Sequence, residues 1–337
     1  MALVRTGLRR IANVGEAVRT TAAGLAGVGT HTLRTFVTPS GAVAACVEAA
    51  WLAAHLAVYP MGLLREQLRV ESAYRTDPLP PVRRSLVVTD VTAAGTPIIL
   101  LHGIMDNRSV FAVFRRALRR RGFGVVHAIN YSLLTGDVRS AARELHGHVQ
   151  RLLDEAGADR LHIVGHSLGG VIARYYVQRL GGHALVDTLV TLGSPHHGTM
   201  TAYLVPTTLG RQLRPGSDVI RELAEPAPDC TTRFLVVWSR TDQLIIPQRN
   251  AQLRHPDLTV EHLELRDVGH LSLPINPRTV HWVATGLLRS DERTHPFRVP
   301  SAQVDDVASG QSDGAAHPVS SRCDVGDTPP ARFAHRP

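Results

Sequence analysis

The sequence contains no lysine, so arginine is the one type of side chain that carries a full positive charge at neutral pH. The formal net charge is +8 with histidine counted as neutral. Uniform arginine usage is better explained by coding bias than by a selected binding surface. A basic protein can bind nucleic acid or an anionic membrane surface. No nucleic-acid-binding motif is present and the chain has only three tryptophans. We therefore expect no nucleic-acid partner, and a membrane surface stays open as a partner.

Cysteine is also scarce. The three cysteines, Cys46, Cys230 and Cys323, are far apart and odd in number. They have neither the spacing of metal ligands nor that of a disulfide framework. A cleavable signal peptide is not evident, because no compact apolar segment with a small-residue cleavage site follows the first arginines. The localisation is therefore left between the cytoplasm and a membrane.

The composition is otherwise that of a globular protein, with 337 residues of which 44% are hydrophobic and 20% charged. This length accommodates one large α/β domain with extensions. We expect an N-terminal extension over 1–80, a catalytic domain over 81–290, and a disordered tail over 291–337, where the chain is polar and rich in Pro, Ser, Asp and Gly. The composition does not predict the oligomeric state.

The segment 41–64 within the extension is hydrophobic, and Glu48 is its only formal charge. As a helix it is long enough to span a bilayer. It is also rich in alanine, and a carboxylate near the middle of a span is costly in lipid. The pattern favours a helix that packs on the catalytic domain or lies at an interface, and a membrane span is the alternative.

Short apolar runs alternate with amphipathic segments after the proline-rich linker at 77–81. This alternation predicts a mostly parallel sheet with helices on both faces. The expected strands are 85–91, 97–101, 124–129, 161–164, 188–192, 234–238 and 259–265. The expected helices are 108–121, 138–156, 171–180 and 277–288.

The sequence VGHSLGG at 164–170 is the most informative stretch of the chain. It places Ser167 between Gly165 and Gly169, after an apolar strand and before a helix. In this G-x-S-x-G context a sharp turn holds the serine at the edge of the sheet, where its hydroxyl is accessible. A solvated serine in a glycine-rich turn is the structural alternative. The pattern predicts that Ser167 is a nucleophile.

A serine hydroxyl needs a neighbouring base, commonly a histidine oriented by a carboxylate. In a parallel sheet the residues that follow the strands converge at one crevice. Asp242 follows the expected strand 234–238, and His270 follows the expected strand 259–265. The chain order Ser167, Asp242, His270 is typical of an α/β-hydrolase. The alternatives are a capping aspartate at Asp242 and an ordinary loop histidine at His270.

Acyl transfer also requires hydrogen-bond donors for the oxyanion that develops on the substrate. The residue after the nucleophile, Leu168, is expected to give one through its backbone N–H. The loop that follows the strand 97–101 begins with His102, Gly103 and Ile104. The backbone N–H of Ile104 is the expected second donor, although this stretch also reads as an ordinary strand-to-helix turn.

These motifs, together with the stretch GSPHHGT at 193–199, resemble the bacterial triacylglycerol lipases and esterases of the α/β-hydrolase superfamily, especially those of actinobacterial type. The resemblance covers about 85–290. It implies an α/β-hydrolase fold with a small helical cap at about 199–229. It also implies hydrolysis of carboxylic or lipid esters through an acyl-enzyme on Ser167, without a cofactor. Calcium occurs in some lipases of this type, but we identify no acidic cluster here that would hold a metal.

Two other functions use the same residues. An acyltransferase would pass the acyl group to an alcohol or lipid acceptor instead of water. An inactive hydrolase fold would act as a membrane-associated scaffold, and the presence of all three expected catalytic residues argues against it. The apolar residues of the cap are expected either to line an acyl pocket or to make ordinary core contacts.

Overall fold

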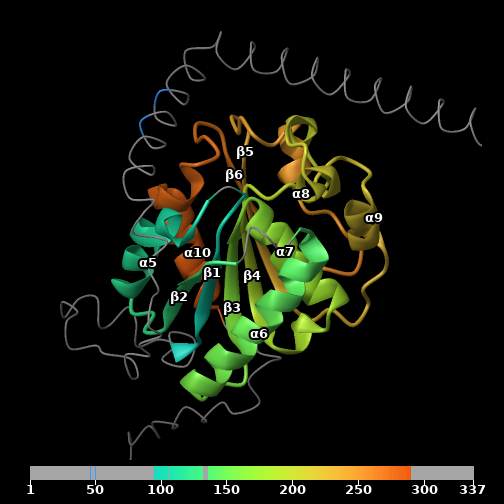
Figure 1. Ribbon diagram of the computed structural model, residues 1–337. Coiled ribbons are helices and arrows are strands. Elements are labelled where there is room, and N and C mark those ends of the chain that lie inside the picture. The colour runs from blue at the N-terminus through green and yellow to red at the C-terminus, as the bar shows by residue number, and fades with distance from the viewer. Residues whose placement is uncertain (1–45, 47–49, 51–94, 105, 132–135, 290–337) are drawn as a thin grey trace, which may run out of the picture. The chain divides into compact units, whose positions relative to one another are not determined.

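The computed structural model describes residues 46, 50, 95–104, 106–131 and 136–289. Its centre is a parallel sheet of six strands in the order β2-β1-β3-β4-β5-β6 (Figure 1). The strands are β1 (Ile98–Leu101), β2 (Val126–Ile129), β3 (Leu161–His166), β4 (Val186–Leu192), β5 (Arg233–Ser239) and β6 (Thr259–Leu265). The predicted α/β-hydrolase type of sheet is therefore confirmed.

The strand order reverses direction between β1 and β3. The chain goes from β1 outward to β2, returns to β3 on the other side of β1, and then continues in the opposite direction through β4, β5 and β6. The connections that leave β1 and β3 therefore begin side by side, at the carboxyl ends of two neighbouring strands where the strand order reverses. Ligands of open α/β sheets bind at such a point. Ser167 follows β3 and His102 follows β1, so both lie at this point.

Helices cover both faces of the sheet (Figure 1). The larger helices are α5 (Ala112–Arg119), α6 (Val138–Ala156), α7 (Leu168–Arg179) and α10 (Pro277–Leu287). Short 3-10 helices are η2 (Arg108–Phe111), η3 (Gly182–Ala184), η5 (Gln248–Ala251) and η6 (Leu273–Ile275). Every strand and helix that the sequence predicts within the described residues is present, with shifts of a few residues at its ends.

Alternating strand residues pack into two separate cores. Ile99 and Leu101 of β1 face the core beneath α6 and α7, whereas Ile98 and Leu100 face the core beneath α5 and α10. This alternation follows from the two-residue period of a strand. Because both faces are covered, the central strands are apolar throughout, which is why they appear in the sequence as continuous apolar runs.

The edge strand β6 has a different surface. Its residues are mostly half-buried or exposed. Glu261 forms ion pairs with Arg233 and Arg289, and Glu264 with Arg240 and Arg266. These four pairs place charges of both signs along the edge of the sheet that β6 forms.

The expected cap region contains η4 (Met200–Leu204), α8 (Thr208–Gln212) and α9 (Asp218–Ala224). Four of its apolar side chains belong to the same core as α6 and α7: Leu209, Leu213, Val219 and Leu223. These four side chains make core contacts, which is one of the two roles expected for the apolar residues of this region, whereas Leu204 is 53% exposed. We call residues 199–229 the insertion below.

Several predictions concern residues outside the described ranges. They are the strand 85–91, the N-terminal extension apart from Cys46 and Ala50, and the tail 291–337. In the described part of the chain, no helix has both the length and the apolar character that a bilayer span requires. Membrane attachment through 41–64 stays a prediction from the sequence.

Candidate active site

Ser167 occupies the turn between β3 and α7 in a strained backbone conformation. Its φ is 54° and its ψ is −123°, and within the described residues it is the one non-glycine residue with positive φ. Such strain costs about 1–3 kcal/mol and persists where the surrounding structure enforces it. Here the N–H of Ser167 donates to the carbonyl of Leu192 at the end of β4, at 2.9 Å, which holds the turn on the sheet.

The two glycines around Ser167 make this turn sterically feasible. A Cβ on Gly165 would lie 2.5 Å from the Cα of Gly170, and a Cβ on Gly169 would lie 2.2 Å from the carbonyl oxygen of Leu101. Both contacts are with backbone atoms, which cannot move aside as a flexible side chain would. The G-x-S-x-G spacing therefore reflects the close approach of α7 to the ends of β3 and β1.

Asp242 and His270 form a buried hydrogen-bonded pair. The Nδ1 of His270 lies 2.8 Å from Oδ2 of Asp242, and the two residues are 1% and 0% exposed. An ionised carboxylate only accepts hydrogen bonds, so Nδ1 carries the proton and the lone pair of the neutral ring is on Nε2. The other carboxylate oxygen, Oδ1, accepts the N–H groups of Leu244 and Ile245, each at 2.8 Å.

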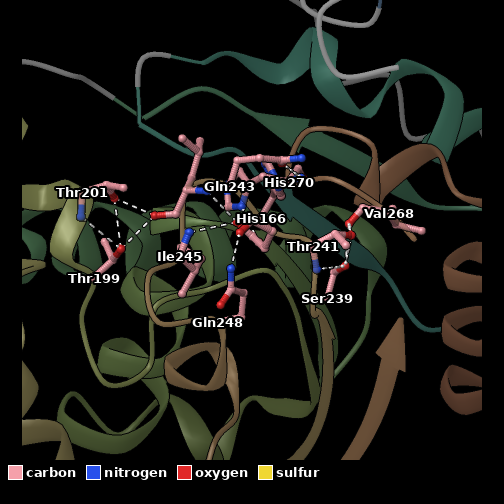
Figure 2. Close-up of polar contacts among 12 residues, drawn as sticks. His166, Thr199, Thr201, Ser239, Thr241, Gln243, Ile245, Gln248, Val268 and His270 are labelled. Carbon is pink, nitrogen blue, oxygen red and sulfur yellow. Dashed lines mark hydrogen bonds and ion pairs between the residues drawn. The ribbon is translucent and has the colours of Figure 1, made fainter. Parts of the chain in front are cut away.

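The loops on which these residues lie contact one another. The Nε2 of His166, the residue before Ser167, donates to the carbonyl of His270 at 3.1 Å. On the opposite side, the backbone N–H of His270 donates to Oε1 of Gln243 at 3.2 Å. Figure 2 shows His166, Gln243 and His270 gathered in one cluster. The structure thus brings the three sequence-predicted residues Ser167, Asp242 and His270 to the same end of the sheet.

The loop after β1 lies directly against Ser167. A Cβ on Gly103 would lie 3.0 Å from the Cβ of Ser167, so a side chain at position 103 would crowd the serine. Ile104 is the next residue in this loop and is half-buried. Leu168 is the first residue of α7, so its N–H has no partner earlier in that helix. Leu168 therefore directly follows Ser167, and Ile104 directly follows the glycine that lies against it.

Tyr131 supports this loop, and the sequence did not single it out. Its hydroxyl donates to the carbonyls of His102 and Gly103 at 3.1 and 3.2 Å, and its ring stacks on that of His102 at 4.4 Å between centroids. Burial and the nearby carboxylate of Asp106 raise the pKa of Tyr131 far above its ordinary value. The phenol therefore stays protonated and remains a donor.

The insertion also meets the loop that carries Asp242. Thr199 and Thr201 of the insertion lie at one end of the cluster in Figure 2. Outside the insertion, Gln248 of η5 donates from its side chain to the carbonyl of Asp242 at 3.0 Å. On the other flank, the hydroxyls of Ser239 and Thr241 both donate to the carbonyl of Val268. Hydrogen bonds thus fix the loop between β5 and η5, which carries Asp242 and which we call the acid loop, and the loop after β6 that carries His270.

Known proteins that are similar to this chain in sequence or fold include thioesterases and lipases. The family model described as palmitoyl protein thioesterase matches residues 97–228. Crystal structures with the same architecture include Aspergillus fumigatus lipase B, at a TM-score of 0.52 and 17% identity, over 58% of this chain and 52% of that one. The chain has the α/β-hydrolase fold and is lipase/esterase-like.

Sequence relatives of this α/β-hydrolase include two curated enzymes. A triacylglycerol lipase of Burkholderia plantarii is 30% identical over 132 residues, which are 36% of each chain. The lysosomal thioesterase PPT2-B of Xenopus laevis is 25% identical over 125 residues, 35% of this chain and 43% of that protein. The matched part spans less than half the length of these relatives.

Among the residues that the structure describes, no three or more His, Cys, Asp or Glu side chains are grouped so that they could hold a metal ion.

Proposed function

We propose that this α/β-hydrolase cleaves acyl esters through an acyl-enzyme formed on Ser167. The proposal is supported chiefly by one observation, the buried hydrogen bond between Asp242 and His270 beside a serine held in a strained turn. A buried carboxylate bonded to Nδ1 fixes the histidine tautomer that acts as a base through Nε2. The thioesterase and lipase relatives agree with chemistry on an acyl group.

In the proposed reaction, the Oγ of Ser167 attacks the carbonyl carbon of the ester while Nε2 of His270 takes the hydroxyl proton. Asp242 stabilises the imidazolium that forms. The N–H groups of Ile104 and Leu168 bind the oxyanion of the tetrahedral intermediate. The intermediate collapses as His270 returns the proton to the leaving alcohol or thiol. Water, deprotonated in turn by His270, then attacks the acyl carbon. The bond from that carbon to Oγ of Ser167 breaks, the carboxylic acid leaves, and His270 returns the proton to Oγ.

The decisive test is the substitution Ser167→Ala. We expect it to abolish hydrolysis of p-nitrophenyl esters and labelling by a fluorophosphonate probe, while the circular dichroism spectrum is unchanged. Ser140→Ala is the matched control, because Ser140 lies at the start of α6, where its hydroxyl bonds to Asp137. It should retain both signals. If Ser167→Ala kept wild-type turnover, Ser167 would not be the nucleophile.

The same preparation distinguishes the substrate classes that the relatives suggest. Rates on matched acyl chains attached through oxygen or sulfur compare ester with thioester hydrolysis, and product analysis with added glycerol detects transfer to an alcohol. We propose hydrolysis of lipid or other acyl esters as the main reaction. A membrane or lipid surface as the location of the substrate is part of this proposal.

A further inference from the structure

Thr199, the last residue of the GSPHHGT stretch, connects the insertion to the loop that carries Asp242. Its side chain is buried, with 5% exposure. Its hydroxyl oxygen accepts the N–H of Ile246 at 2.9 Å and donates to the carbonyl of Leu244 at 2.8 Å. One hydroxyl group therefore holds both ends of the three-residue segment 244–246 (Figure 2 shows Thr199 beside Ile245).

The same segment orients the carboxylate of Asp242. Oδ1 of Asp242 accepts the N–H groups of Leu244 and Ile245, and Oδ2 faces Nδ1 of His270. A rotation of the carboxylate would break the two backbone hydrogen bonds, so their positions determine where Oδ2 points. The hydroxyl of Thr199 thus acts on the Asp242–His270 pair through the backbone of residues 244–246.

Thr199 is itself fixed by the insertion. Its N–H donates to the carbonyl of Leu213, the C-cap residue that follows α8, at 2.8 Å. The next N–H, that of Met200, donates to the carbonyl of Ile246 at 2.8 Å. Thr201 adds a hydrogen bond from its hydroxyl to the carbonyl of Leu244 at 2.6 Å. The acid loop is therefore attached to α8 through a continuous set of backbone and hydroxyl contacts.

We propose that Thr199 is a positioning residue for the reaction proposed above, and that the insertion acts on catalysis through it by fixing the carboxylate of Asp242. The inference rests on the proposed function for its kinetic consequences. Its structural consequence, the strength and order of the hydrogen bond between Asp242 and His270, is independent of any substrate.

Loss of the hydroxyl leaves the buried N–H of Ile246 without this partner, and the carbonyl of Leu244 keeps only the hydrogen bond from Thr201. An unsatisfied buried donor drives the segment to rearrange. A displaced carboxylate supports the imidazolium less well. We therefore expect Thr199→Val to lower kcat between about tenfold and a hundredfold, which is the usual effect of a small misplacement at a reacting centre. KM should change little, because the Thr199 side chain is buried away from solvent.

Three further variants separate positioning from a general structural effect. Thr199→Ser keeps the hydroxyl and should restore most of the kcat. Thr201→Val removes one of the bonds to the Leu244 carbonyl but none to the Ile246 N–H, so an intermediate loss is expected. Thr207→Val is the matched control, because it removes the hydroxyl that caps α8 in the same insertion, 3.1 Å from the N–H of Gly210. It should lower stability and leave kcat unchanged.

Two readouts accompany the rates. In the pH profile of kcat/KM, the limb that reports the histidine should move to lower pH in Thr199→Val, because the imidazolium is less well stabilised, and should not move in Thr207→Val. The second is the downfield proton resonance of His270 Nδ1, assigned by its loss in His270→Gln. It should broaden or exchange faster in Thr199→Val.

Equal kcat values and an unchanged His270 resonance in Thr199→Val and Thr207→Val would overturn the proposal, as would a Thr199→Ser variant no more active than Thr199→Val. If Thr199→Val did not fold, an unaltered rate and pH profile in Thr201→Val would overturn it instead. A wild-type protein without esterase activity would contradict the proposed function, whereas the His270 resonance would still test the role of Thr199.

Discussion

Gly193 lies where β4 ends, beside the Asp242–His270 pair, and its φ is +57°. A Cβ at this position would lie 3.1 Å from Nδ1 of His270 and 3.2 Å from Oδ2 of Asp242, and only 2.7 Å from a methyl group of Leu273. The glycine therefore serves two purposes. It permits a left-handed backbone, and it leaves room for the two side chains to meet.

The substitution Gly193→Ala separates these purposes when it is compared with Gly157→Ala. Gly157 also has positive φ, 61°, but nothing lies within 4 Å of an added Cβ. Both variants should lose about 1–2 kcal/mol of unfolding free energy, the cost of a left-handed alanine. Only Gly193→Ala should also lose ester hydrolysis, by at least about tenfold, because it displaces His270. Urea denaturation and initial rates measure the two effects, and equal activity in both variants would contradict this account.

For individual residues, the sequence predicts a role where the evidence lies in the residues directly around them. Ser167 was predicted because its glycines and its flanking strand and helix are contiguous, and Asp242 and His270 because each follows a strand. Tyr131 and Thr199 were not assigned roles, because their contacts join residues 28 and 45 positions apart. An isolated tyrosine or threonine gives no sign of such a contact before the fold is known.

The insertion is attached to the catalytic domain by charged and polar contacts as well as by its core residues. Arg139 of α6 contacts both Asp218 and Glu222 of α9, and the hydroxyl of Tyr175 donates to Glu222 at 2.7 Å. Arg174 of α7 is buried, and it donates to the carbonyls of His196 and Leu223. These contacts hold the insertion on α6 and α7.

Arg139→Met tests how much the ion pairs contribute. The pKa values of Asp218 and Glu222 are lowered chiefly by hydrogen bonds from Arg139. Groups with lowered pKa values stabilise the fold above their ordinary pKa and lose that effect as the pH falls through the folded value. We expect a loss of about 1 kcal/mol at pH 7, limited by solvent screening. The difference from wild type should shrink between pH 5 and pH 3.

Arg143→Met provides the comparison for this experiment, because Arg143 is exposed on the same helix and its side chain bonds to Ser140 rather than to the insertion. It should change the unfolding free energy much less. A pH-independent effect of Arg139→Met would show that packing of its methylene groups, rather than charge, stabilises α9.

The elements themselves were predictable because buried parallel strands and amphipathic helices have distinct periods. The role of the insertion was less predictable from the sequence. Its apolar residues fit both an acyl pocket and a core, since periodicity shows that a side chain is buried but not what covers it. The position of α9 against α6 and α7 depends on Arg139, Tyr175 and Arg174 as well as on core residues, and these polar contacts join residues 47 to 83 positions apart.

Buried histidines affect the molecule as a whole. Burial, and then the charge of Arg174, hold the pKa of His196 well below its ordinary value, and burial also lowers the pKa values of His197 and His262. Neutral histidines of this kind stabilise the fold above the ordinary histidine pKa. As the pH falls below that value, the unfolded chain binds protons that the folded protein does not, and stability is lost.

We therefore expect the thermal unfolding midpoint to fall between pH 7 and pH 5, above the range in which most carboxylates titrate. Each such group contributes at most about 1.4 kcal/mol per pH unit. His196→Gln should be less stable than wild type at pH 8, because it changes a fully buried site, and should show a shallower dependence on pH. Parallel curves for the two proteins between pH 7 and pH 5 would contradict this assignment.

The charges along β6 have a consequence for the behaviour of many molecules together. An edge strand offers unpaired N–H and C=O groups to which a strand of another chain can add. Glu261 and Glu264 lie on this strand with their arginine partners, so a second copy that approached in register would bring like charges face to face and strip water from the ion pairs. The edge thereby disfavours aggregation through sheet extension.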